Sequence, residues 1–338
     1  MGAPLWVTKI GAELLKDSMS LRPSKWQSLE NAPPQYIAFN VTEFCNSLCS
    51  FCCYKTSKPR YTMSNEIFFK AAKEYHDVGG RKIWLNALTG EPLLDPDFFS
   101  KTSILQSLGN FNDVVLTTNG ILLNKENNIE SIINSGISKI EISTAGFEKS
   151  VYEKVMGVRK YDEFLSGLSR LITRNQECGN PISITIFVRG SIDAADTNDF
   201  SSRILPLIDS SGGKVTLSFW RLLLDWIGQV KEGDIPDGLG FMPRGRIRIK
   251  PCRNSFGLGI LANGDIRLCN VQYGSDGGTD DLTLGNLKVD SLCEVWNSSK
   301  TRRVRRTTYG PNSNKICVRC RCYEPIYHQY PYQLKSDQ

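Results

Sequence analysis

Six apolar, β-branched segments alternate with five helix-like segments over the first two thirds of the chain, and this alternation limits the possible folds most strongly. The expected strands are residues 35–41, 82–88, 113–119, 139–145, 182–188 and 214–220. The expected helices are residues 64–78, 95–108, 126–135, 160–175 and 197–208. Near-continuous apolar strands that alternate with helices predict βαβ units and a parallel sheet covered on both faces. The predicted class is α/β, and six such units fit a barrel or partial barrel.

The pattern changes after Trp220. Residues 221–250 carry Gly, Pro and scattered charge, which is typical of a linker. From Pro251 onward the chain is rich in Cys, Gly and Arg and has short apolar segments. We therefore expect four parts: an N-terminal extension (1–34), the partial barrel (35–220), the linker (221–250) and a small cysteine-rich domain (251–338).

The chain has eleven cysteines and two histidines. The odd number excludes a fully paired disulfide framework, and the scarcity of histidine argues against a His-rich metal site. The first residues have no basic stretch followed by an apolar one, so we expect no secretory signal and a cytoplasmic protein with reduced thiols. In that compartment, many cysteines indicate metal or redox chemistry.

Membranes and nucleic acids are not expected partners. No uninterrupted apolar run reaches the roughly 18 residues that a membrane span needs. The net charge of +6 is modest, and no aromatic residues interleave with the basic runs at 244–250 and 302–306. We expect those runs to be solvated faces.

Four of the cysteines fall in the stretch TEFCNSLCSFCCYK, just after the first expected strand. The spacing Cys45-x3-Cys49-x2-Cys52 lets three thiolates converge on one soft metal centre. A [4Fe–4S] cube with three cysteine ligands would leave one iron open to a small molecule. The alternatives are a structural zinc site with Cys53 as fourth ligand, or thiols buried as core residues.

A second set of cysteines lies near the C-terminus. A tight turn at NGD (263–265) would bring Cys252 and Cys269 together. Cys317 and Cys320, spaced C-x2-C, would complete four thiolates for one fully ligated cluster. A structural zinc in a four-cysteine ribbon fits the same spacing equally well.

The first cysteine motif, placed after the first strand of a six-fold βα chain, resembles that of the radical S-adenosylmethionine (SAM) superfamily. The resemblance implies a [4Fe–4S] cluster on Cys45, Cys49 and Cys52 whose open iron binds SAM. Residues 89–92, TGEP, are similar to the family's Gly-Gly-Glu-Pro motif, with Thr89 replacing the first glycine. That motif implies that Gly90 and Glu91 hold the SAM amino group.

Further positions extend this resemblance to SAM contacts. Phe51 matches an aromatic position near the adenine, and Ser143, in EISTAG, matches a serine that contacts the ribose. Asn119, in the TTNG that ends the third strand, is a further candidate. Arg189 could pair with the SAM carboxylate through its bidentate guanidinium, or form a surface salt bridge.

The C-terminal pattern resembles the SPASM/Twitch extension of radical SAM enzymes: C-x11-G-x4-C, then GNL…SLCEVW (285–296), then C-x2-C. Since only Cys322 follows Cys320, the shorter Twitch form is the better match, which implies one auxiliary [4Fe–4S] cluster on Cys252, Cys269, Cys317 and Cys320. DWIG (225–228) is similar to sequences at the same junction in SPASM relatives.

The resemblance implies reductive cleavage of SAM to a 5′-deoxyadenosyl radical that removes a substrate hydrogen atom. We expect oxidation or epimerisation of a small polyhydroxylated molecule, such as a sugar or aminocyclitol, with an electron donor such as flavodoxin or ferredoxin. The alternatives are modification of a ribosomal peptide and, less favoured, a non-catalytic zinc protein that binds nucleic acid. Epimerisation would need a thiol hydrogen-atom donor, for which Cys322, Cys293 and Cys53 are candidates.

Cys53 is not expected to be a cluster ligand, because a fourth thiolate would close the iron that SAM needs. In an extended segment its side chain would point away from that of Cys52. Cys178 lies outside every cluster pattern, and we expect it to be inert.

Overall fold

The computed structural model describes residues 30–326 apart from 31, 58–59, 86–87, 126, 191, 237, 244–247, 249 and 271–279. The expected N-terminal extension lies almost wholly outside the described residues, as does most of the basic run at 244–250.

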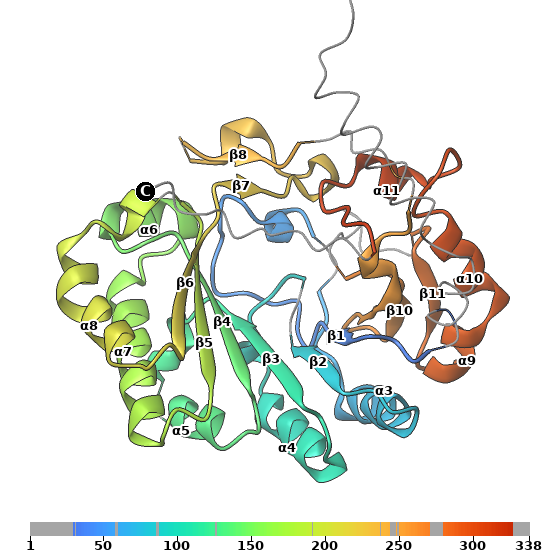
Figure 1. The fold of residues 1–338 in the computed structure, drawn as a ribbon, viewed down its shortest axis with the longest axis horizontal. Helices are drawn as coiled ribbons and strands as arrows, with labels where there is room; N and C mark the ends of the chain where they lie inside the picture. The colour runs from blue at the N-terminus through green and yellow to red at the C-terminus, as the bar shows by residue number, and fades with distance from the viewer. Residues whose placement is uncertain are drawn as a thin grey trace, which may run out of the picture.

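Every one of the six expected strands forms, in chain order and parallel to its neighbours (Figure 1). They are β1 (Ile37–Phe39), β2 (Lys82–Leu85), β3 (Asp113–Thr118), β4 (Lys139–Thr144), β5 (Ser183–Val188) and β6 (Val215–Phe219). Most strands are shorter than the expected apolar segments, whose end residues lie in the adjoining loops. Those loops carry most of the predicted site residues.

Helices cover the outer face of this sheet (Figure 1). They are α3 (Asn65–Asp77), α4 (Phe98–Leu108), α5 (Asn128–Ile133), α6 (Lys149–Met156), α7 (Tyr161–Glu177) and α8 (Leu205–Asp209). Short single turns fill the loops: η1 (Cys53–Lys55), η2 (Pro92–Leu94), η3 (Ile121–Asn124), η4 (Ile192–Ala195) and η5 (Phe200–Ile204).

Helix α6 was not expected from the sequence. It begins after Glu148, whose carboxylate accepts hydrogen bonds from the backbone N–H groups of Ser150 and Val151, and ends at Gly157 with φ +66°. An acidic N-cap and a left-handed glycine are the local signals of a short helix. The segment was too short to show a convincing apolar periodicity.

Alternate strand residues face the helices and the concave side of the sheet. Ile140, Ile142, Ile184 and Ile186 are fully buried in the core that the helices cover. The residues between them along β4 and β5 are only partly buried. Because side chains alternate along a strand, these less buried residues line the concave side.

The C-terminal part continues the same sheet at the β1 edge. Strand β9 (Leu258–Ile260) pairs in parallel with β1, and β10 (Asp265–Arg267) and β11 (Thr283–Asn286) follow as antiparallel neighbours. The full order is β11-β10-β9-β1-β2-β3-β4-β5-β6. The predicted α/β class, a partial barrel followed by a cysteine-rich part, is confirmed.

Residues 221–250 contain a small pair of strands, β7 (Leu222–Leu223) and β8 (Gly240–Phe241), with the turns η6 (Trp226–Gly228) and η7 (Glu232–Asp234) between them. Beyond them lie η8 (Arg253–Phe256) and the helices α9 (Leu292–Asn297), α10 (Ser299–Arg306) and α11 (Lys315–Arg319). As expected, the turn at 261–265 folds β9 and β10 into a hairpin.

The basic run on α10 is not simply a solvated face. Arg305 is buried, with its guanidinium 4.5 Å from the ring centre of Trp296 and 5.0 Å from that of Phe256. Because Arg can stack on aromatic rings while it keeps its charge, this residue fixes α10 to α9 and η8 instead of facing solvent.

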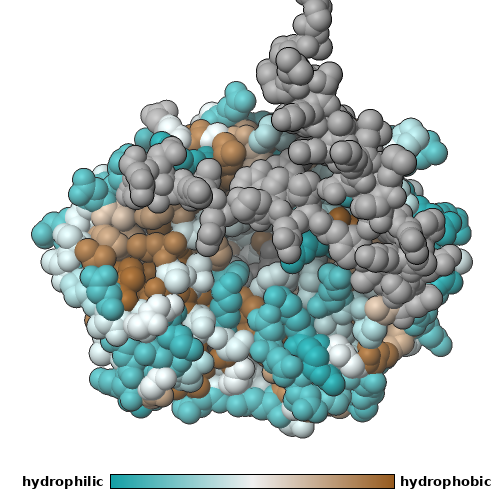
Figure 2. All heavy atoms as spheres, viewed as in Figure 1, coloured by the Kyte–Doolittle hydropathy of each residue, from teal (hydrophilic) through white to brown (hydrophobic). Residues whose placement is uncertain are grey.

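The surface in Figure 2 is hydrophilic along the rim formed by α3, α4 and α5, and an apolar area lies over α6 and α8. Val151 on α6 and Leu205 on α8 are exposed apolar side chains. Among the described residues, none of the helices has the length and apolar character needed to cross a membrane.

Candidate active site and auxiliary cluster site

The loop that carries Cys45, Cys49 and Cys52 follows β1 and is held against the end of α6. The backbone N–H of Leu48 donates to the Met156 carbonyl at 3.1 Å, and that of Ser50 donates to the Val155 carbonyl at 2.8 Å. The Ser47 hydroxyl also donates to the Met156 carbonyl, at 2.7 Å, and lies 3.1 Å from Cys49 Sγ. The unsatisfied carbonyls at a helix C-terminus therefore fix this loop.

The three thiols lie close enough to affect one another's ionisation. Burial is the main cause that raises the pKa of Cys45 and of Cys49 to about 12; Glu91 adds to the effect at Cys45, and neighbouring thiols of the set add to it at both. The pKa of Cys52 is also raised, first by its hydrogen bond with Cys53 and then by burial. Buried thiolates this close need compensating positive charge, which iron in a cluster supplies. The donor set therefore fits a cluster held by three cysteines.

The expected geometry of Cys53 is wrong. Cys53 does not lie in an extended segment but begins the turn η1, where it is buried. The Ser57 hydroxyl lies 3.7 Å from Cys53 Sγ and donates to the Cys53 carbonyl at 3.0 Å. The Cys53 thiol also makes a hydrogen bond with that of Cys52, which lowers its pKa. Cys53 thus contacts a predicted ligand instead of pointing away from it.

The TGEP loop crosses directly over the start of the cysteine loop. Gly90 has φ +101°, and a Cβ at this position would lie 2.1 Å from the Thr42 carbonyl oxygen. The next N–H, that of Glu91, donates to the Phe44 carbonyl at 2.8 Å. This contact explains glycine at the second motif position, since no side chain fits there.

Glu91 is buried, and both of its carboxylate oxygens accept hydrogen bonds from the chain. Oε1 accepts from the Thr118 hydroxyl at 2.7 Å and from the Leu93 N–H at 3.3 Å, while Oε2 accepts from the Asn119 N–H at 2.8 Å. Burial raises the pKa of Glu91 to about 7, although these hydrogen bonds pull it downward. Glu91 thereby ties the TGEP loop to the end of β3.

Asn119 extends this connection to the cysteine loop. Its side-chain amide Nδ2 donates to Asn46 Oδ1 at 2.7 Å and lies 3.9 Å from Cys45 Sγ. The TGEP and TTNG motifs therefore meet at the first cysteine.

Phe51, Ser143 and Arg189 converge on the other side of the loop. The Arg189 guanidinium lies 5.6 Å from the ring centre of Phe51, and its Nε donates to the Ser143 hydroxyl at 3.5 Å. Burial lowers the pKa of Arg189 to about 10, while Cys49 and Cys52 favour its charged form. Arg189 is therefore a partly buried cation beside the thiols.

Trp220 is a residue of this group that the sequence did not single out. Its ring centre lies 4.8 Å from the Arg189 guanidinium, and the ring contacts Phe187 edge-on. The available signal was its position at the end of the sixth strand, which in a barrel faces the same mouth as the other strand ends.

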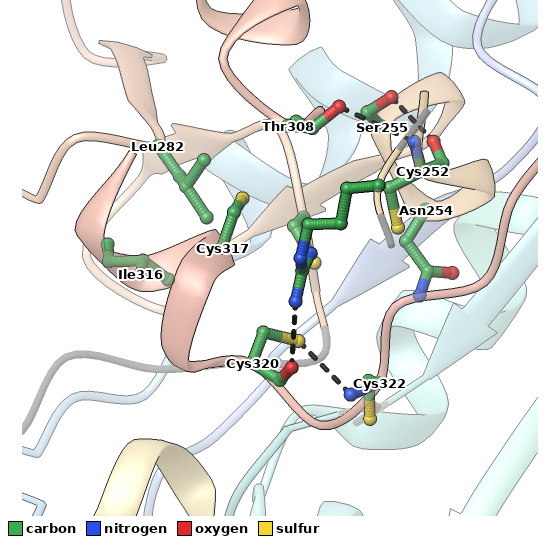
Figure 3. Close-up of a pocket in the computed structure, with 11 residues that line it drawn as sticks. Cys252, Asn254, Ser255, Leu282, Thr308, Ile316, Cys317, Cys320 and Cys322 are labelled. Atoms are coloured by element: carbon green, nitrogen blue, oxygen red, sulfur yellow. Dashed lines mark hydrogen bonds between the residues drawn. The ribbon is translucent and has the colours of Figure 1, made fainter. Parts of the chain in front are cut away.

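The second set of cysteines surrounds one pocket in the C-terminal part (Figure 3). Its lining comprises Arg248, Cys252, Asn254, Ser255, Cys269, Leu282, Thr308, Ile316, Cys317, Cys320 and Cys322. The hairpin supplies Cys252 and Cys269 from its two ends, and α11 supplies Cys317. In Figure 3 the Cys322 sulfur points away from those of Cys252 and Cys317.

The pocket fits an iron–sulfur cluster by the same physical test. Burial raises the pKa of Cys317 to about 12, with Cys269 and Cys320 adding to the effect. The pKa of Cys252 is also raised, by burial first and then by Cys269 and Cys320. Cys320 differs, because a hydrogen bond with Cys322 lowers its pKa to about 7. A set of neighbouring thiols of which two are buried and disfavoured as thiolates suits a cofactor that brings positive charge.

Arg248 and Tyr36 also belong to this site, and the sequence did not identify them. Arg248 Nη2 donates to the Cys320 carbonyl at 2.9 Å, and its guanidinium lies 4.6 Å from the ring centre of Tyr323. The Tyr36 hydroxyl donates to Asn270 Oδ1 at 3.0 Å. The pKa of Tyr36 is raised well above its ordinary value, mainly by burial and then by Cys269 and Cys252.

The remaining cysteines lie elsewhere. Cys293 is on α9, where its Sγ approaches the Glu74 carbonyl of α3 at 3.7 Å. Cys178 is exposed at the end of α7. Within the described ranges, no three or more His, Cys, Asp or Glu side chains are arranged to hold a single metal ion.

The geometry thus defines a protein with two iron–sulfur sites, one of them held by three thiols at the mouth of a partial barrel. Residues 39–190 match the model of the radical SAM superfamily, and residues 252–321 match that of SPASM, an iron–sulfur cluster-binding domain. The chain belongs to the radical SAM superfamily and carries a SPASM domain. Its cofactors are SAM, the [4Fe–4S] cluster that binds it and an auxiliary cluster.

Curated relatives are similar over part of the chain. GTP 3′,8-cyclase of Haemophilus influenzae is 26% identical over 140 residues, which are 40% of this chain and 40% of that protein. The enzyme of Pasteurella multocida is 24% identical over 170 residues, 49% of this chain and 48% of the relative. The chain therefore matches about half or less of these relatives' length.

Solved structures share the fold along most of the chain. BtrN in complex with AdoMet and 2-DOIA is 16% identical with a TM-score of 0.53, over 85% of this chain and 92% of BtrN. Streptococcus suis SuiB bound to the precursor peptide SuiA is 15% identical with a TM-score of 0.60, over 88% of this chain and 72% of SuiB. At this identity the likeness shows the fold alone.

Proposed function

We propose that the protein cleaves SAM reductively and uses the resulting radical to oxidise a small polyhydroxylated molecule, such as a sugar or an aminocyclitol. The observation that carries the first half is the convergence of Phe51, Ser143 and Arg189 beside the three-thiol loop. When reduced, the cluster there supplies one electron that splits SAM into methionine and a 5′-deoxyadenosyl radical.

The surrounding residues bind and orient SAM. The Arg189 guanidinium is the cation for the SAM carboxylate, and the Ser143 hydroxyl contacts the ribose. Phe51 provides a flat apolar surface for the adenine. Glu91 and the backbone at Gly90 receive the amino group, and Asn119 holds the first cysteine in place. A radical formed here has to be kept away from water and from other side chains.

The concave face of the sheet supports the substrate class. Thr117, Glu141, Thr185 and Thr216 are direct neighbours across β3, β4, β5 and β6. The Thr117 hydroxyl donates to Glu141 Oε2 at 3.3 Å, and the hydroxyls of Thr185 and Thr216 lie 3.3 Å apart. A row of hydroxyls around a carboxylate can hydrogen-bond several substrate hydroxyls at once.

This polar row lies next to the SAM contacts. Ser143 is two residues beyond Glu141 on β4 and is level with Phe187 and Ser218 on the next strands. Glu141 also favours the charged form of Arg189, and only 17% of its side chain is exposed. Lys139, 2.9 Å from Glu141, adds a cation to the same face. A small polar substrate on this row would lie within reach of the SAM ribose.

The positions of the thiols favour oxidation over epimerisation. Cys53 is packed against Ser57, Cys293 lies between α3 and α9, and Cys322 lines the auxiliary pocket. Of the described concave-face positions on β3 to β6, none is a cysteine that could return a hydrogen atom. In an oxidation, an auxiliary cluster held by Cys252, Cys269, Cys317 and Cys320 would supply the acceptor for the second electron of the substrate, with the loss of a proton.

The test is an anaerobic incubation with SAM, dithionite and a panel of sugars, aminocyclitols and peptides deuterated on carbon. We expect mass spectrometry to find deuterium in 5′-deoxyadenosine only with a polyhydroxylated substrate, which loses two hydrogens. Deuterium transfer from a peptide alone would contradict the proposed substrate class.

Glu141→Gln removes the carboxylate charge from the polar row. We expect kcat/KM for the substrate to fall about tenfold or more, since hydrogen bonds to charged groups contribute about 1.5–3 kcal/mol. Formation of 5′-deoxyadenosine without substrate should persist. The matched control is Glu130→Gln, which removes an exposed carboxylate paired with Arg174 on the helical side. Equal effects of the two variants would contradict the role of the row.

A further inference from the structure

The turn that joins the barrel to the C-terminal part has an unusual backbone. Trp226 has φ +48° and Ile227 has φ +61°, two consecutive residues in the left-handed region that is normally left to glycine. For a β-branched residue such as Ile227 this conformation is an outlier. Such strain persists only where the surrounding structure determines it. Residues 225–228, here called the strap, are held from two sides.

On one side the strap is bound to the SAM-cluster loop. The Trp226 indole N–H donates to the Phe51 carbonyl at 3.0 Å. Phe51 immediately precedes Cys52, and its ring faces Arg189. Directly after the strap, Gln229 Oε1 accepts a hydrogen bond from the Thr56 hydroxyl at 2.8 Å.

On the other side the strap is bound to the loop of the auxiliary site. Arg319 Nη2 donates to the Ile227 carbonyl at 2.7 Å, and Arg321 Nε lies 2.9 Å from Asp225 Oδ2. The Asp225 side chain in this ion pair is only 2% exposed. Arg319 and Arg321 are the residues on either side of Cys320. The left-handed turn is what lets Trp226 and the Ile227 carbonyl reach opposite neighbours.

We propose that Trp226 is a positioning residue through which the auxiliary site fixes the SAM-cluster loop. When the thiols of the auxiliary site are held by their cluster, Arg319 and Arg321 keep the strap in place. Trp226 then fixes the Phe51 carbonyl, and with it the position of the neighbouring Cys52. The coupling is reciprocal: if the auxiliary site orders the SAM-cluster loop, the SAM-cluster loop also orders the auxiliary site. This inference rests on SAM binding at the barrel mouth as proposed above.

The test is a double-mutant cycle on SAM affinity with the reconstituted protein. Its four members are the wild type, Trp226→Phe, the auxiliary-site variant Cys317→Ser/Cys320→Ser, and the combination. We expect Trp226→Phe and the auxiliary-site variant each to raise the SAM Kd about fivefold to tenfold, which is the range of one hydrogen bond. The SAM Kd of the combined variant should not exceed the larger of the two separate Kd values, because both changes break the same link.

The matched control is Trp296→Phe. The Trp296 indole N–H donates to the Ala32 carbonyl at 2.8 Å, so the substitution removes the same kind of hydrogen bond away from both cysteine loops. We expect an unchanged Kd for this variant. An unchanged Kd for Trp226→Phe would overturn the proposal. So would a combined variant whose fold-increase in SAM Kd is the product of the two separate fold-increases.

A second measurement tests the role of the strap independently of SAM binding and hence of the proposed function. If the wild type binds no SAM, the proposed function fails, but the EPR spectrum of the reduced SAM-loop cluster still reports on the strap. We expect Trp226→Phe and Arg319→Gln to change its g-values in the same direction, and Trp296→Phe to leave them unchanged. Because Arg319 is exposed, Arg319→Gln also serves if Trp226→Phe does not fold. Spectra that coincide with the wild type in all three variants would contradict the coupling.

Discussion

Cys52 and Cys53 are neighbours in the chain and their thiols touch, yet only one of them fits the role of a ligand. Cys52 faces Arg189 together with Cys49, whereas Cys53 is buried in η1 against Ser57. The difference arises from the start of a helical turn at Cys53, not from the alternation of an extended strand. Adjacent residues can therefore differ in role through backbone conformation alone.

Removing each of these thiols should separate the two roles. In Cys52→Ala, the SAM-loop cluster should be lost, since two thiolates cannot hold it. In Cys53→Ala, it should be retained, with a shifted reduction potential because a hydrogen bond to the Cys52 sulfur is gone. Iron and sulfide content after anaerobic reconstitution, together with an EPR redox titration, checks both expectations. The reverse pattern of iron loss would mean that the third ligand is misassigned.

Glu91 predicts a pH dependence of stability. Burial raises its pKa from 4.5 to about 7 in the folded protein, so the folded state binds the proton more tightly than the unfolded chain. The stabilising contribution is therefore complete below about pH 4.5 and is lost as the pH rises to about 7. A shift of this size corresponds to roughly 3 kcal/mol.

The measurement is urea unfolding between pH 4.5 and 7.5 in the variant with Cys45, Cys49 and Cys52 replaced by alanine, where the cluster next to Glu91 does not contribute. Glu91→Gln in the same background should flatten this part of the stability curve. Identical pH slopes with and without the Glu91 carboxyl would show that another group is responsible.

At the scale of elements, α6 fixes the position of the SAM-cluster loop. Its last carbonyls receive the N–H groups of Leu48 and Ser50, and its terminal Gly157 approaches the same loop. The sequence predicted the loop and its cysteines but not this helix, because eight residues carry too little periodicity. The cap signals at Glu148 and Gly157 were present and could have located it.

Gly157→Ala should disturb the loop through this contact. A Cβ at Gly157 would lie 2.5 Å from the Leu48 carbonyl oxygen, and φ is +66°. Gly179 ends α7 with a similar φ of +78° and has nothing within 4 Å of the added Cβ. Both variants should lose about 1 kcal/mol from backbone strain, and only Gly157→Ala should lose roughly 2 kcal/mol more and part of its SAM-loop iron.

Unfolding midpoints and iron content measure these two losses separately. Equal stability and equal iron content in Gly157→Ala and Gly179→Ala would show that α6 does not position the loop.

At the scale of the whole molecule, the barrel and the C-terminal part share one nine-stranded sheet. The six barrel strands were predictable because each is a local apolar pattern with helices between. The parallel pairing of β9 with β1 was not predictable, because it joins residues more than 200 positions apart and rests on three-residue strands. Local pattern cannot specify such a contact.

The site residues also fall into those that the sequence could predict and those that it could not. Cysteine spacing identified both sets of thiols, and the strand-end motifs identified Glu91, Asn119, Ser143 and Arg189. Two of the residues that link these motifs, Trp220 and Arg248, come from segments without a motif of their own. Trp226 lies in DWIG, but the likeness of that segment did not indicate its contact with the Phe51 carbonyl. All three are defined by what they touch in the folded chain, which no spacing rule describes.

The measurement that tests the central claim most directly is 5′-deoxyadenosine formation by the anaerobically reconstituted protein with SAM and dithionite, with iron counted in the same samples. The account predicts that the wild type forms 5′-deoxyadenosine. It also predicts that the protein with Cys45, Cys49 and Cys52 replaced by alanine forms none while it retains the auxiliary iron. No 5′-deoxyadenosine from the fully loaded wild type, or loss of all iron from the triple variant, would contradict the account.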